Sequence, residues 1–167
     1  FTFMGMPPVV AGLIIYLILS RQGPLGVLGL LYTPSAMIIA QVLLASPIVT
    51  GLTMVGIRAR GGEVEETARS LGAGSYLAAW TVICESRFSI LGAVITGFSR
   101  VVAEVGAVMI VGGNIEGHTR VMTTAIVLES RKGNFELAIG LGIILLIISF
   151  FINTILYNLQ KGGLNNR

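Results

Sequence analysis

Long apolar runs alternate with short polar stretches along this chain of 167 residues. Four of the runs approach or reach the length of about 17 to 25 residues that a helix needs to cross a bilayer. Charged, glycine and proline residues, which are typical of turns, separate them. The pattern predicts an all-α integral membrane protein, a multi-span helical bundle that forms one domain over 1–167. The predicted spans are 4–20, 35–57, 88–112 and 137–159.

The composition agrees with a membrane protein. The chain is 54% hydrophobic and 11% charged, whereas soluble domains carry about 25% charged residues. A single cysteine, Cys84, excludes an internal disulfide, and the lone His118 has no cysteine or histidine nearby to complete a metal site. Aspartate is absent, and the net charge of +3 is too small to indicate nucleic acid. We therefore expect the lipid bilayer as a partner, and neither catalytic nor metal-binding residues.

Two features of the apolar runs concern the architecture. Pro47 lies inside the span 35–57 and should kink it, which frees a backbone carbonyl that needs another donor. The chain starts at Phe1 inside an apolar run, and no signal peptide is visible. We expect a fragment that lacks further N-terminal spans.

A polar insert over 61–85 separates the second and third predicted spans. Glu63 to Leu71 is expected to form a short helix whose first-turn glutamates face the positive end of the helix dipole. Gly72 is well placed to end that helix, and Ser75 to cap a second helix over 76–84. Gly61 and Gly62 are interpreted as hinges, Glu65 and Arg69 as an i,i+4 ion pair. The insert thus forms an elbow on a membrane surface, with an apolar stripe of Tyr76, Leu77, Trp80 and Ile83.

The third predicted span, 88–112, carries Arg100 and Glu104 near its middle. A charge within a span costs about 2.5–3.5 kcal/mol on insertion scales, so such groups pair or face a polar cavity. Their i,i+4 spacing allows them to pair with each other. Gly113 and Asn114 end the span, and a polar loop over 113–136 with a short amphipathic piece follows.

Lysine and arginine are divided unequally between the two predicted faces, with six on the side of the insert and four on the other. This excess favours a cytoplasmic insert and C-terminus. The six are Arg58, Arg60, Arg69, Arg87, Lys161 and Arg167, and the four are Arg21, Arg120, Arg131 and Lys132.

Residues 66–72, Glu-Thr-Ala-Arg-Ser-Leu-Gly, resemble the EAA loop of bacterial ABC importer permeases. Glu66, Ala68 and Gly72 match the family pattern in register. Glu85 stands where the family has a proline, so the second helix is expected to run straight into the next span. Residues 97–114 and 6–13 also resemble the molybdate, tungstate and sulfate permeases. The resemblance covers nearly the whole chain and is strongest to the tungstate-type permease.

The resemblance implies a type I ABC importer permease with its EAA elbow, the coupling helix, in the cytoplasm. Such permeases are multi-pass proteins of the prokaryotic cell (inner) membrane. They work as homodimers with a cytoplasmic ATP-binding subunit, which holds ATP and Mg, and with an external oxyanion-binding protein. This chain itself would need no cofactor. The residues implied in coupling are Glu65, Glu66, Ala68, Arg69, Ser70, Leu71 and Gly72.

The implied function is an ATP-driven importer of tungstate, with molybdate as a second substrate. Alternatives are a permease for sulfate or another small anion, and an unrelated multi-span membrane enzyme. Arg100 and Glu104 are candidates for lining the anion pathway or for a purely structural ion pair. Gly113 and Asn114 are candidates for the outer gate or for a helix cap.

Overall fold

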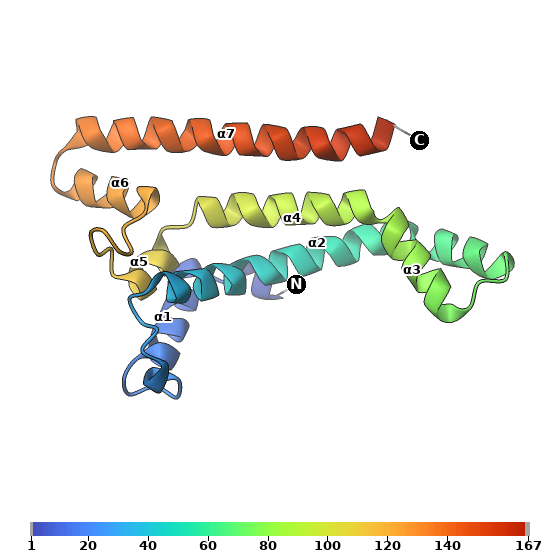
Figure 1. The fold of residues 1–167 in the computed structure, drawn as a ribbon, viewed down its shortest axis with the longest axis horizontal. Helices are drawn as coiled ribbons and strands as arrows, with labels where there is room; N and C mark the ends of the chain where they lie inside the picture. Colours follow the sequence, from blue (N-terminus) through green and yellow to red (C-terminus); the bar gives the residue numbers. More distant parts are fainter. Residues whose placement is uncertain (1, 166–167) are drawn as a thin grey trace.

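The computed structural model describes the backbone of residues 2–165 and the side chains of 3–158 and 160. Arg167 lies outside the described residues, as does the side chain of Lys161. Within the described range every regular element is a helix (Figure 1). The elements are η1 (Thr2–Gly5), α1 (Pro8–Leu19), η2 (Gly26–Leu28), α2 (Pro34–Ser70), α3 (Ser75–Glu85), α4 (Arg87–Val102), α5 (Gly106–Gly112), α6 (Met122–Arg131) and α7 (Phe135–Asn165).

Helix α4 lies between α2 and α7, and the three run along the long axis of the molecule (Figure 1). Gly97 makes the α2 contact possible, because a Cβ there would lie 2.4 Å from Val49 Cγ2. Toward α7, the Ser99 hydroxyl donates to Asn153 Oδ1 at 2.6 Å, and Gln160 Nε2 donates to the Phe88 carbonyl at 3.2 Å. Close backbone packing on one side and hydrogen bonds on the other therefore hold α4.

The buried core lies at the end of the molecule where α1, α5 and the first turns of α2 meet (Figure 1). Gly12 lets α5 approach closely, because a Cβ there would lie 2.7 Å from Ala107 Cα. Small side chains line this contact, as is common where helix backbones meet in membrane proteins. The core residues are Ala11, Ile15, Leu19, Ala36, Met37, Ala40, Leu44, Ala107, Val108 and Val111.

Helix α2 begins where the sequence places a cap and a proline. Thr33 Oγ1 accepts the Ala36 N–H at 3.4 Å, and Pro34 occupies the first turn, where its missing N–H costs little. Pro47 removes the donor for the Leu43 carbonyl, and the Ser46 hydroxyl donates to that carbonyl at 3.4 Å. The hydrogen-bond donor that the Leu43 carbonyl needs is thus supplied by Ser46 of the same helix.

Helices α2 and α7 extend beyond the predicted spans 35–57 and 137–159, and the other two predicted spans change more. Two described helices have the length and apolar composition of a span, Pro34–Ser70 and Phe135–Asn158, and the bent pair α3–α4 would make a third. The predicted span 4–20 is replaced by α1, whose 12 residues extend about 18 Å, well short of the hydrocarbon core. The predicted span 88–112 is divided into α4 and α5.

Candidate functional site

The elbow turns at Gly72, as the sequence predicts. Gly72 has a φ of +87°, a left-handed conformation that glycine adopts without strain. Its N–H donates to the Arg69 carbonyl at 2.9 Å, and the Ala73 N–H donates to the Ala68 carbonyl at 3.0 Å. These two bonds form a Schellman motif, which satisfies the last carbonyls of α2 and reverses the chain.

The separate short helix predicted for Glu63 to Leu71 is wrong, because these residues continue α2 as far as Ser70. Gly61 and Gly62 are helical and do not act as a hinge between two helices. Gly61 is buried, and a Cβ there would lie 3.3 Å from Val82 Cγ1, so the glycine makes room for α3. The glutamates consequently lie in the last turns of α2, at the negative end of its dipole rather than the positive one.

Helix α3 packs back on α2 through small residues and leaves its larger apolar side chains outside. Ala78 and Val82 are buried against α2, together with Ala68. Gly74 rather than Ser75 is the N-cap residue of α3. The predicted apolar stripe is exposed along its whole length, and Leu71 is 84% exposed beside it. The stripe residues are Tyr76, Leu77, Trp80 and Ile83.

A cleft of about 680 Å³ opens between the end of α2 and α3. Apolar groups such as Val64 and Leu77 line it, and Glu63 and Glu85 also contribute to its wall. Around it, Arg69 Nη2 lies 2.7 Å from Glu65 Oε1, the predicted ion pair, and both side chains are about half exposed. The elbow therefore offers an apolar surface with charges at its rim.

The exit from the elbow is bent. Helix α3 ends at Glu85, α4 begins at Arg87, and their axes differ by 56°. The expectation that α3 runs straight into the next helix is therefore wrong. Ser86 is buried at the bend, and its N–H still donates to the Val82 carbonyl at 2.9 Å. The chain thus bends without the proline that marks this position in the family pattern.

A second interruption, the break at residues 103–105, separates α4 from α5 and contains Glu104. One carboxylate oxygen accepts the Ala107 N–H at 3.2 Å, and the other lies 3.7 Å from Arg100 Nη1. Glu104 is 5% exposed and Arg100 48% exposed. The Thr123 hydroxyl donates to the Glu104 carbonyl at 3.4 Å. The predicted pair is thus present, and its acid also satisfies a free N–H at the start of α5.

Gly113 and Asn114 lie together where α5 ends. Both have positive φ, +70° and +52°, and the Gly113 N–H donates to the Met109 carbonyl at 3.0 Å. The buried Thr119 hydroxyl donates to the Gly112 carbonyl and accepts the Ile115 N–H. In this geometry Gly113 closes the helix, while Asn114 Oδ1 is buried without a hydrogen-bond partner in the described chain.

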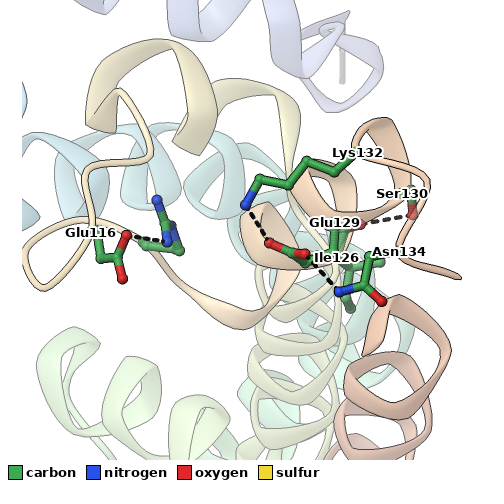
Figure 2. A network of polar contacts seen from close by, with 7 residues as sticks. Glu116, Ile126, Glu129, Ser130, Lys132 and Asn134 are labelled. Atoms are coloured by element: carbon green, nitrogen blue, oxygen red, sulfur yellow. Dashed lines mark hydrogen bonds and ion pairs between the residues drawn. The ribbon is translucent and has the colours of Figure 1, made fainter. Parts of the chain in front are cut away.

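Charged residues gather beyond this turn, around the end of α6 (Figure 2). Lys132 Nζ donates to Glu129 Oε1 at 2.8 Å, and Asn134 Nδ2 donates to Glu129 Oε2 at 3.2 Å. The Lys132 hydrogen bond is the main cause that lowers the pKa of Glu129. Arg120 pairs with Glu116 at 3.0 Å. These contacts hold the polar loop in shape at the end of the molecule away from the elbow.

The elbow and the break do not meet. They lie at opposite ends of α4, so the candidate coupling residues and the candidate pathway residues form two separate sites (Figure 1). Sequence reasoning did not find the capping role of Glu104. The sequence signal for this cap was an acidic residue three positions before Ala107. It was overlooked because the apolar character of the segment favoured one continuous helix.

The long apolar helices and the bent helix pair indicate the class of the protein, which is an integral membrane protein. Comparison with related proteins then identifies its family. The tungstate uptake system permease protein TupB of Peptoclostridium acidaminophilum is 49% identical over 161 residues, which cover 96% of this chain and 71% of the relative. A probable anion ABC transporter permease protein of Haloferax volcanii is 42% identical, over 92% and 68% of the two chains. TupB of Campylobacter jejuni is 41% identical, over 96% and 67%.

Relatives of lower identity are named as sulfate and molybdenum transport permeases. No protein-family model matches the chain. From the high identity over most of both lengths, the chain belongs to the family of anion permease subunits of ABC transporters. Its relatives are named as permease proteins of uptake systems, so the chain is a transport subunit and not itself an enzyme.

Proposed function

We propose that this chain is the permease subunit of an ATP-driven tungstate importer, with molybdate as its second substrate. The observation that carries the proposal is the identity of 49% and 41% to two permeases named for tungstate uptake. In this proposal the chain resides in the prokaryotic inner membrane as a homodimer. An external oxyanion-binding protein delivers the substrate.

The elbow is the proposed contact with the cytoplasmic ATP-binding subunit, which holds ATP and Mg. Its geometry supports this role, since Trp80 and Tyr76 are exposed on α3, which packs against the end of the long helix α2. Exposed aromatic side chains beside a cleft are common anchors in protein interfaces. Glu65, Glu66, Arg69 and Ser70 supply polar contacts at the rim, while Ala68 and Gly72 fix the shape of the turn.

Arg100 is the proposed anion contact within the pathway. Its guanidinium is half exposed, whereas its partner Glu104 is buried and engaged at the start of α5. This arrangement leaves the positive group accessible, and the buried acid moderates its attraction for a dianion. Gly113 and Asn114 lie on the outer side of the same broken span and are proposed to limit access from that face.

Two measurements test the proposal. In co-expression with the ATP-binding subunit, the wild-type chain should retain that subunit on purification, and Trp80→Glu should release it. Val27→Glu is the matched control, since Val27 is 98% exposed but lies in the loop after α1, far from the elbow. In cells, excess unlabelled tungstate should suppress tungstate uptake more strongly than molybdate, and molybdate more strongly than sulfate.

Failure of the wild-type chain to retain any ATP-binding subunit would contradict the coupling role. Stronger competition by sulfate than by tungstate would favour the alternative of a sulfate permease. Equal loss of the subunit in both glutamate variants would show that folding rather than the elbow surface is responsible.

A further inference from the structure

A pocket of about 670 Å³, lined by both polar and apolar groups, lies at the end of the molecule opposite the elbow. The last turn of α1, the loop after it and the residues before α2 form its wall. Its lining includes Tyr16 and Tyr32, whose ring centroids are 6.4 Å apart, together with Arg21 and Gln22. No described function of the elbow or the break uses these residues.

The charge of the pocket favours an anion. Its lining contains Arg21 and no carboxylate. Residues 1–62 contain no aspartate or glutamate, and Arg21 is the only charged residue before Arg58. A pocket lined by a cation and uncharged donors, with no acid among its lining residues, has a positive local potential that attracts anions.

The tyrosine pair adds a hydrogen-bond donor. The neighbouring Tyr16 hydroxyl is the main cause that raises the pKa of Tyr32, which lies in the loop before α2. Each phenol O–H can donate a hydrogen bond, so the two tyrosines add donors to the lining. The Gln22 amide supplies further donors at the wall. These groups match the acceptor oxygens of a tetrahedral oxyanion.

Tyr32 is held in a strained conformation. Its φ of +62° lies in the left-handed region, which a bulky residue rarely adopts. Its N–H donates to the Val111 carbonyl at 2.9 Å, and its ring lies where a side chain on Gly113 would be, 2.7 Å from a Cβ built there. Backbone strain that the surrounding structure maintains is often found at ligand sites. Here the strained residue, Tyr32, connects the pocket to the end of α5.

From this geometry we propose that Tyr16, Arg21, Gln22 and Tyr32 form a second, outer site for the transported oxyanion, separate from Arg100. The inference rests on the proposed function, which supplies a dianion as substrate. One cation and a few neutral donors make a weak site, suited to receiving an anion and releasing it. Through Tyr32, occupancy of the pocket acts on α5 and thus on the break that contains Glu104.

The test measures protection of an engineered thiol in the complete importer, reconstituted in vesicles. Cys84 is the only cysteine, so Cys84→Ser gives a cysteine-free background. In that background Gln22→Cys is labelled with an anionic methanethiosulfonate, with sodium tungstate or with sodium chloride of equal ionic strength. Tungstate should slow labelling about fivefold or more, as expected for a dianion bound near one cation. Adding Arg21→Gln should remove the protection, and Tyr32→Phe should reduce it.

Val27→Cys is the control, because Val27 is in the same loop and 98% exposed but does not line the pocket. Equal labelling of Gln22→Cys with and without tungstate would overturn the proposal, as would equal protection of Val27→Cys. Protection that requires the binding protein but not the anion would make the pocket a docking contact and would also overturn it. Tungstate uptake without protection refutes only this site, whereas absence of uptake refutes the proposed function.

Discussion

Two interruptions of helical structure, the elbow at Gly72 and the break at Glu104, are built in opposite ways. At the elbow, one glycine with positive φ reverses the chain, and large apolar side chains stay exposed. At the break, the carboxylate of Glu104 is buried and accepts one N–H at the start of the next helix, although Ala103 beside it is exposed. The first interruption depends on local backbone chemistry, the second on contacts between distant segments. The elbow, which exposes an apolar surface, therefore requires a glycine at its turn. The break, which holds a buried charge, requires an acidic residue that caps the next helix.

The largest effect is expected at the break. Glu104→Leu removes the acceptor of the Ala107 N–H and the partner of Arg100, and should cost about 2–3 kcal/mol. Thermal unfolding in detergent should show a Tm lower by about 5 °C. Glu104→Gln keeps an oxygen for the N–H and should cost less than about 1 kcal/mol. Equal losses in the two variants would mean that the charge, not the cap, maintains the break.

A smaller effect on stability is expected at the elbow. Gly72→Val places a β-branched residue at a φ of +87°, which costs about 1–2 kcal/mol. In the assembled importer we expect ATP hydrolysis to continue while anion uptake falls. Gly74→Val is the matched control, since Gly74 has a φ of −67° that valine adopts readily. Unchanged uptake in Gly72→Val would argue against coupling through this turn.

Substitutions at the two adjacent glycines of α2, Gly61 and Gly62, test whether close packing positions α3. Gly61→Leu should cost about 1 kcal/mol or more by overpacking, because a Cβ at Gly61 already lies 3.3 Å from Val82. Gly62→Leu should stabilise α2 by several tenths of a kcal/mol, since Gly62 is exposed with nothing within 4 Å. Chemical denaturation of both variants measures the difference. Identical shifts would show that α3 does not depend on the close approach.

The smallest effect is expected from the exposed ion pair of the elbow. Arg69→Ala should cost only a few tenths of a kcal/mol, and less at high salt, because Arg69 and Glu65 are both about half exposed. Arg100→Ala should cost more, since it leaves the carboxylate of Glu104 buried beside fewer partners. Thermal unfolding at two salt concentrations compares them. A larger loss for Arg69→Ala would reverse the ranking of the two sites.

Local chemistry was predictable from the sequence, and distant contacts were not. The stop at Gly72 and the Glu65–Arg69 pair each depend on residues within about one helical turn. The same holds for the start of the second predicted span, placed at residue 35 and found at Pro34. Gly61 makes room for Val82, 21 positions later, and this contact is not visible locally, so the glycine pair was misinterpreted as a hinge.

The break illustrates the same limit. Its pair of charges was visible from i,i+4 spacing, but its position depends on Thr123 and on Val9, which lies 3.1 Å from a Cβ built on Gly106. Those contacts join three segments that no local pattern connects. The roles of the coupling residues and of Arg100, Glu104, Gly113 and Asn114 in transport stay predictions.

The continuity of α2 has a mechanical consequence. Its 37 residues extend about 55 Å, nearly twice the thickness of the hydrocarbon core, from the buried core near Ala36 to the turn at Gly72. If α2 tilts as one body about its core end, small rotations are amplified along its length, so that a tilt of about 5° displaces the other end by about 5 Å. Conversely, a push of a few ångströms at the elbow produces only a slight rotation at the core, with a correspondingly larger force.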